Sequence, residues 1–371
     1  MKHPEKLTRR SFLQKTTAAV TGGFMSFAKP SFPESDLDFK IGQMIMTHFA
    51  GLQMNDEIRH LILYEHLGGV LLFESNFASA ASPKASLYKL VSDLHKISPA
   101  PLFIAMDQEG GAVNRLKEKY SFPQTYSARY LGERNDLNFT KQAADTIAST
   151  LADIGINHNF APVVDLNVNP RNPVVGATGR CFSAYPEVVT RHASVFVQAH
   201  QEQHIISTLK HFPGHGSSTQ DSHAGLADVT QTWRRAELIP YRRLIQQGRA
   251  DSIMTAHIFN ANLDEKHPAS LSYKTITGIL RQNLGFDGVV ISDDLLMGAI
   301  KDQYDLKASI YHAVNAGNDI LLFTTIANDL ILQVKGIIKE HVKSGRISMQ
   351  RINESHARIK KLKRRLVERT E

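Results

Sequence analysis

Short apolar runs alternate with amphipathic stretches along the chain from residue 36 onward. The runs are continuously hydrophobic, without a regular alternation of apolar and polar residues, which is typical of strands covered on both faces in a parallel sheet. Eight runs are predicted as strands, at 45–51, 68–73, 101–107, 156–166, 205–212, 251–257, 288–294 and 319–323.

The stretches between these runs show helical periodicity. Five are predicted as helices, at 85–97, 140–154, 186–202, 273–284 and 306–317. A basic amphipathic helix is predicted at the C-terminus, where Ile352, Ile359, Leu362 and Leu366 share one side. Eight strands separated by helices predict an α/β fold, a single (β/α)8 TIM-type barrel over residues 36–371, with a doubly wound open sheet as the alternative.

Polar side chains gather where the predicted strands end. They are Asp107, Asp165, Lys210, His211, His257, Asp293 and Asp294. In a barrel of this type all these strand ends lie on one face, where active sites are built. So many chemically capable groups at successive strand ends favour an enzyme site over isolated strand caps.

The net charge of +7 is confined to the two ends of the chain. Residues 1–28 carry +4 and residues 357–371 carry +5, which leaves −2 for the remainder. A basic nucleic-acid-binding face is therefore not expected. The single cysteine, Cys181, excludes an intramolecular disulfide within one chain.

The N-terminal segment "TRRSFLQKTTAAVTGGFMSFAKP" combines twin arginines, Phe12-Leu13 and a weakly apolar run. This order predicts a twin-arginine export signal over residues 1–28, cleaved after Ala28, with an unstructured basic N-terminus as the alternative. The apolar run is too short to span a bilayer, so no stable membrane anchor is expected. The prediction is an exported, periplasmic protein of bacterial type.

The segment "KHFPGHGSSTQDSH", residues 210–223, concentrates titratable side chains. His211 and His215 are four apart, as in helical zinc sites, but Pro213 between them prevents the helix that such a site needs. Lys210 precedes the glycines, whereas the lysine of a phosphate-binding loop follows them. Neither a metal nor a phosphate cradle is therefore expected here.

The same segment ends in a pair suited to acid/base chemistry. Asp221 and His223 are two residues apart, so both side chains project to one side of an extended segment. An aspartate beside a histidine fixes its tautomer and stabilises the imidazolium ion. Asp293, at the end of the predicted strand "GVVIS", is the best-placed carboxylate for a nucleophile.

Three motifs, "DQEGG" with Arg115 downstream, "KHFPGHG…DSH" and "SDDLLMGA", together resemble family-3 glycoside hydrolases. More narrowly, they look like the β-N-acetylglucosaminidase branch, and the likeness runs in order over nearly all of residues 36–365. The resemblance implies a (β/α)8 barrel and a retaining exo-glycosidase. Its carbohydrate substrates would be β-N-acetylglucosaminides of cell-wall or chitin-type glycans.

The resemblance also implies residue roles. Asp293 would attack the anomeric carbon to form a covalent glycosyl-enzyme, while His223, paired with Asp221, would protonate the leaving oxygen and later deprotonate water. This differs from the usual scheme with two carboxylates. The implied sugar-binding residues are Asp107, Arg115, Arg180, Lys210 and His211. No metal, other cofactor or nucleic-acid partner is implied, and a monomer is expected.

Three features leave questions open. Glu74 stands where the family usually carries an arginine, which reverses a charge near the outer subsites. The loop around Arg180 is slightly longer than the family's loop, and His215 has no assigned role beyond holding its own loop's backbone.

A phosphorylase is an alternative function, because a neutral histidine repels phosphate less than a carboxylate does. A non-catalytic glycan-binding protein is the other, although it would not need Asp221, His223 and Asp293 together.

Overall fold

The structure is a computed structural model that describes residues 36–222, 225–324 and 328–367. The predicted export signal at residues 1–28 and the predicted proton donor His223 lie outside these ranges.

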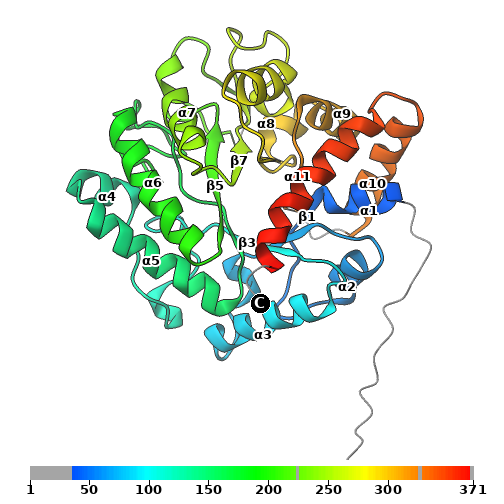
Figure 1. Cartoon of the computed structure of the whole chain (residues 1–371), viewed down its shortest axis with the longest axis horizontal. Helices are drawn as coiled ribbons and strands as arrows, with labels where there is room; N and C mark the ends of the chain where they lie inside the picture. The colour runs from blue at the N-terminus through cyan, green and yellow to red at the C-terminus, as the bar shows by residue number, and fades with distance from the viewer. Residues whose placement is uncertain (1–35, 223–224, 325–327, 368–371) are drawn as a thin grey trace, which may run out of the picture. The chain divides into compact units, whose positions relative to one another are not determined.

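Within the described ranges, eight parallel strands form a barrel with the helices around it (Figure 1). The strands are β1 (Ile45–Thr47), β2 (Gly69–Leu71), β3 (Phe103–Met106), β4 (His158–Asn159), β5 (Ile206–Phe212), β7 (Ser252–Thr255), β9 (Val289–Ser292) and β10 (Leu321–Phe323). Their order is β10-β1-β2-β3-β4-β5-β7-β9, and a parallel bridge between Ile291 and Ile320 links the two ends of this series. The predicted (β/α)8 barrel is confirmed, and each of its strands lies inside a predicted run.

The strands are buried along their whole length, which explains why their sequences do not alternate. Every residue of β3, β5, β7 and β9 is buried, because one face meets the barrel interior and the other meets the helices. A short two-stranded ribbon, β6 (Ala227–Asp228) and β8 (Ile258–Phe259), lies outside the barrel sheet.

The helices of the described ranges alternate with the strands. They are α1 (Asp36–Gln43), α2 (Asp56–Leu63), α3 (Pro83–Ile97), α4 (Ala128–Arg134), α5 (Leu137–Ile154), α6 (Pro186–Glu202), α7 (Ile239–Gln246), α8 (Gly298–Lys301), α9 (Leu306–Ala316), α10 (Asn328–Lys343) and α11 (Met349–Val367). Short 3-10 turns are η1 (Glu74–Asn76), η2 (Glu118–Tyr120), η3 (Arg235–Leu238) and η4 (Ala269–Leu271). None of the helices in the described part of the chain has the length and hydrophobicity to cross a membrane.

The predicted helices correspond to α3, α5, α6, α9 and α11, with one difference in type. The stretch predicted at 273–284 is a π-helix, η5 (Lys274–Asn283). Local signals set the ends of α5: the Asp136 side chain accepts hydrogen bonds from the Asn138 and Phe139 amides, and Gly155 ends the helix in a left-handed conformation.

The basic C-terminal helix α11 uses part of its charge to attach to the barrel. Arg351, Arg358 and Arg365 are seven residues apart, so they lie on one side of the helix. Arg351 Nη2 lies 2.7 Å and Arg358 Nη1 3.4 Å from Asp319 Oδ1. Arg365 Nη1 lies 2.6 Å from Asp251 Oδ1. Three of the arginines of this helix are therefore ion-paired within the fold.

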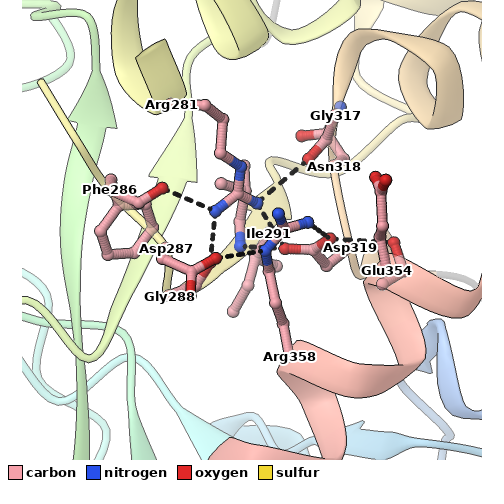
Figure 2. Close-up of polar contacts among 12 residues, drawn as sticks. Arg281, Phe286, Asp287, Gly288, Ile291, Gly317, Asn318, Asp319, Glu354 and Arg358 are labelled. Carbon is pink, nitrogen blue, oxygen red and sulfur yellow. Dashed lines mark hydrogen bonds and ion pairs between the residues drawn. The ribbon is translucent and has the colours of Figure 1, made fainter. Parts of the chain in front are cut away.

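Asp319, just before β10, is the centre of this network (Figure 2). Its side chain is 0% exposed, and its Oδ2 accepts hydrogen bonds from Arg281 Nη2 at 2.6 Å and from the Val290 amide at 3.0 Å. Burial opposes ionisation, but the charges of Arg281, Arg351 and Arg358 lower the pKa of Asp319 below its ordinary value. One carboxylate thus joins η5, β9, β10 and α11.

Replacing Asp319 by alanine should lower the free energy of unfolding by about 3 kcal/mol or more, because buried arginine partners lose their counter-ion. The matched control is Asp287→Ala, since Asp287 also pairs with Arg358 but is 74% exposed. The control should stay within about 0.5 kcal/mol of the wild type. Urea unfolding of the three proteins makes the comparison, and equal losses for the two variants would contradict this account.

Candidate active site

A cavity of about 360 Å3 opens among residues at the carboxyl ends of the barrel strands. Its size falls within the range of about 300–1,000 Å3 that is usual for small-molecule sites. Its lining includes all five predicted sugar-binding residues and the predicted nucleophile: Asp107, Arg115, Arg180, Lys210, His211 and Asp293. Of the other two predicted residues, Asp221 is described but does not line the cavity, and His223 lies outside the described residues.

The parallel barrel explains this convergence. Asp107 directly follows β3, and Asp293 directly follows β9. Lys210 and His211 lie near the carboxyl end of β5. Because all strands run in one direction, their carboxyl ends meet on the same face. Residues more than 180 positions apart in the chain are thereby brought to one cavity.

The buried Lys210 ammonium group joins two carboxylates. Its Nζ lies 2.7 Å from Asp107 Oδ1 and 2.7 Å from Glu109 Oε1. Glu109 in turn accepts two hydrogen bonds from Arg180, from Nε at 2.8 Å and from Nη2 at 2.7 Å. Arg115 Nη2 lies 3.8 Å from Asp107 Oδ2. Four of the five predicted sugar-binding residues, all except His211, thus form one connected ionic cluster with Glu109.

Glu109 is a member of this cluster that the sequence interpretation did not single out. Burial opposes its ionisation, but Arg180 and Lys210 lower its pKa to about 2, so it is a permanent anion. The available signal was its position in "DQEGG", two residues after Asp107. Side chains at that spacing can point to one side of an extended segment and reach the same lysine.

Asp165 holds the imidazole of His211. Its Oδ2 lies 2.8 Å from His211 Nδ1, and its Oδ1 accepts a hydrogen bond from the His211 amide at 3.1 Å. A carboxylate cannot donate, so Nδ1 carries the proton and Nε2 can accept a hydrogen bond. That Nε2 lies 3.5 Å from Arg180 Nη2. The orientation of His211 is therefore set by a residue whose role was not assigned from the sequence.

His215 lies in the same cavity lining. The His215 backbone amide does donate a hydrogen bond to Asp165 Oδ1, at 2.8 Å. Its imidazole Nε2 lies 3.1 Å from the hydroxyl of Ser222, which belongs to the same loop and is next to Asp221. Burial lowers the pKa of His215 to about 4, so this imidazole is neutral at physiological pH.

The structure separates Asp293 from its neighbour Asp294. Both oxygens of Asp294 are engaged: Oδ1 accepts from the amides of Leu296 at 3.0 Å and Thr324 at 3.1 Å, and Oδ2 accepts from the Thr324 hydroxyl. Asp293 accepts one hydrogen bond, from the Asp294 amide to Oδ1 at 2.8 Å. Its Oδ2 accepts none from the described residues, so Asp293 has the freer carboxylate.

The surroundings of Asp293 favour its ionised form. Burial opposes ionisation, but His257, His211, the Asp294 amide and Lys210 lower the pKa of Asp293 below its ordinary value. Burial also lowers the pKa of His257, whose Nε2 donates to the Asp294 carbonyl at 2.9 Å. Lys210 keeps its charge, because its carboxylate neighbours outweigh its burial and raise its pKa. Asp293 is therefore a carboxylate at neutral pH.

The negative charge of Glu74, which was expected from the sequence to reverse the charge near the outer subsites, is compensated by its neighbours. Glu74 lies in η1, outside the cavity lining, with Lys117 Nζ 2.5 Å from Oε2 and Lys119 Nζ 3.6 Å from Oε1. The Tyr120 hydroxyl also donates to it. Burial opposes ionisation, but hydrogen bonds from Lys117 and Tyr120 lower the pKa of Glu74. Two lysines compensate its charge.

No group of three or more His, Cys, Asp or Glu side chains in the described residues is arranged to hold a metal ion. The two histidines that suggested a zinc site have other partners: Asp165 for His211 and Ser222 for His215.

Residues 36–362 match the family model described as the Glycosyl hydrolase family 3 N terminal domain. A similar relative is Beta-hexosaminidase A from Pseudoalteromonas piscicida, 34% identical over 334 residues, covering 84% of this chain and 55% of the relative. Another is Beta-hexosaminidase from Xylella fastidiosa (strain M23), 35% identical over 302 residues, covering 79% of this chain and 87% of the relative.

A solved structure gives the same result. A glycoside hydrolase family 3 beta-N-acetylglucosaminidase from Paenibacillus sp. str. FPU-7 has a TM-score of 0.84 and 37% sequence identity, over 90% of this chain and 63% of that one. The chain thus spans 55% of the Pseudoalteromonas protein and 63% of the Paenibacillus chain, but 87% of the Xylella protein. On the family match and these identities, the chain is a member of glycosyl hydrolase family 3.

Proposed function

We propose that the chain is a retaining β-N-acetylglucosaminidase that releases terminal β-linked N-acetylglucosamine from glycans. The observation that carries the proposal is the ionised Asp293 in one cavity with the cluster of Asp107, Lys210 and Arg180. The names of the relatives, beta-hexosaminidase and beta-N-acetylglucosaminidase, support the choice of sugar.

The ionic cluster supplies groups suited to a sugar. The Asp107 carboxylate can accept hydrogen bonds from two adjacent hydroxyl groups, while Lys210, Arg115 and Arg180 can donate to others. Lys210 Nζ lies 2.7 Å from both Asp107 and Glu109, so these ion pairs fix the positions of the binding groups. A sugar held there shares one cavity with Asp293, which can then reach the anomeric carbon.

The reaction then takes two steps. Asp293 attacks the anomeric carbon while the bond to the leaving oxygen breaks, and His223, oriented by Asp221, gives that oxygen a proton. In the second step His223 takes a proton from water, the water oxygen bonds to the anomeric carbon, and the Asp293 carboxylate is released. Two displacements at one carbon retain the β configuration.

Replacing Asp293 by alanine should lower kcat on an aryl β-N-acetylglucosaminide by at least about a thousandfold, because no other group replaces the nucleophile. Added azide should restore turnover and give an α-glycosyl azide, since azide attacks from the vacated face. The control is Asp302→Ala, an exposed aspartate near the end of α8, which should retain wild-type kcat.

The same assay distinguishes the alternatives by product. Free N-acetylglucosamine, with or without inorganic phosphate, is the expected product. Sugar 1-phosphate as the main product would identify a phosphorylase, and binding without turnover by the wild type would identify a glycan-binding protein.

We also propose that residues 1–28 direct export through the twin-arginine route, so that the substrates are cell-wall or chitin-type glycans outside the cytoplasm. The support is the order of Arg9-Arg10, Phe12-Leu13, the apolar run and the small residues before Lys29.

Replacing Arg9 and Arg10 by lysine should keep the protein in the cytoplasm at full length. The wild type should be found in the periplasm with Lys29 as its first residue. The control, Lys6→Arg with Lys15→Arg, keeps the twin arginines and the charge. Cell fractionation and N-terminal sequencing give the result, and equal export of both double variants would contradict the proposal.

A further inference from the structure

The turn that follows β5 is held by two buried carboxyl groups. Asp165 Oδ1 accepts hydrogen bonds from the His211 amide at 3.1 Å and the His215 amide at 2.8 Å. Glu237, from η3, accepts one from the next amide, Gly216, at 3.1 Å to Oε2. Two acidic side chains from opposite sides thus bind consecutive amides of the turn.

The turn is also closely packed on both sides. A Cβ added to Gly214, which has φ +121°, would lie 2.6 Å from the Cβ of Glu237. A Cβ added to Gly216 would lie 1.7 Å from the carbonyl oxygen of Leu166. Trp233 Nε1 donates to the Pro213 carbonyl at 3.2 Å. The path of the turn therefore depends on where Glu237 and its neighbours lie.

The two carboxyl groups differ in charge. His211 and His215 lower the pKa of Asp165 against the effect of its burial, so Asp165 is ionised. Glu237 is 1% exposed and forms no ion pair in the described part of the chain. Burial raises the pKa of Glu237 from 4.5 to about 8. The charge of Asp165 adds to this effect, while Ser217 and the Gly216 amide oppose it. At neutral pH Glu237 is a neutral carboxyl group.

The other titratable groups around Glu237 are Tyr241 on α7 and Cys181 in the loop before α6. Burial raises the pKa of both well above their ordinary values, so both are neutral at neutral pH. The His211 imidazole binds Asp165 Oδ2 through Nδ1 at 2.8 Å, and the His215 backbone amide binds Asp165 Oδ1 at 2.8 Å. None of these groups offers Glu237 a compensating positive charge.

We propose that Glu237 is a positioning residue of this enzyme: its carboxyl group fixes the Gly216 amide and thereby the turn that places His211 and His215 at the cavity. The inference rests on the proposed glycosidase function. His215 in this turn also binds the hydroxyl of Ser222. Ser222 directly follows Asp221, so the turn is connected to Asp221 as well. Glu237 touches no substrate and acts only through the backbone.

Ionisation of Glu237 should disturb the turn, because it places a second negative charge beside Asp165 with no cation between them. The neutral form is favoured by the fold, so the folded protein binds one proton more than the unfolded chain between pH 4.5 and about 8. Stability from this group is complete below pH 4.5 and is lost as the pH rises through about 8. Activity should fall over the last part of the same interval.

The test compares Glu237→Gln and Glu237→Ala with the control Glu133→Gln, an exposed glutamate on α4. For the wild type and the control, kcat on an aryl β-N-acetylglucosaminide should fall about tenfold between pH 7 and pH 9 through Glu237, as expected for a group with a pKa of about 8. Glu237→Gln keeps an acceptor for Gly216 but cannot ionise, so its kcat should not show this fall. Glu237→Ala should lower kcat at every pH.

An alkaline fall in Glu237→Gln equal to that of the control would overturn the proposal. A second readout needs no turnover: the drop in Tm between pH 6 and pH 9 should be smaller in Glu237→Gln than in the wild type. If the wild type turns over no β-N-acetylglucosaminide, the proposed function fails, and this Tm difference still shows whether Glu237 is neutral in the fold. If Glu237→Gln does not fold, the substitute experiment is an infrared titration of the protonated carboxyl group in the wild type. A midpoint pH of that titration that differs from the midpoint pH of the fall in kcat overturns the proposal.

Discussion

The buried ammonium group of Lys210 is the interaction on which the arrangement of this site depends. Its side chain is 2% exposed. Moving a charged group out of water into a protein interior without a partner costs on the order of several kcal/mol of free energy. Lys210 therefore requires both Asp107 and Glu109 at its side. Glu109 in turn requires Arg180, and Arg180 lies against His211. One buried cation on β5 thus determines where the proposed sugar-binding residues after β3 and in the loop before α6 lie.

The chemistry available at the end of β9 follows from how two adjacent aspartates divide their hydrogen bonds. Both carboxylate oxygens of Asp294 accept hydrogen bonds, from Thr324 and Leu296, and so fix the backbone after β9. Asp293 is left with one oxygen without a hydrogen bond from the described residues and with positive groups that stabilise its charge. Asp294, which holds the backbone, is therefore adjacent to Asp293, the proposed nucleophile. Their environments distinguish the two aspartates, whereas the sequence "SDD" does not.

The sequence predicted the parts of the structure that depend on local periodicity and on strand ends. The strands of the barrel, five of the eleven α-helices in the described residues and the cavity residues Asp107, Arg115, Lys210 and Asp293 are examples. Contacts between distant segments were not predictable from one chain: Glu109 joining Arg180 to Lys210, and lysines compensating Glu74. The contact of His215 with Ser222 lies within one loop and was not predicted either. The π form of η5 was also missed, because its hydrophobic spacing is close to that of an α-helix.

The central claim is that Asp293 becomes covalently bonded to the sugar. A fluorinated, activated N-acetylglucosaminide that slows the second step should let the intermediate accumulate, and mass spectrometry of the intact protein and its peptides can then locate the added sugar. The account predicts a mass increase of one sugar residue, on Asp293 within the peptide "SDDLLMGA". A label on Asp294 or on any other residue, or a product released with inverted configuration, would contradict it.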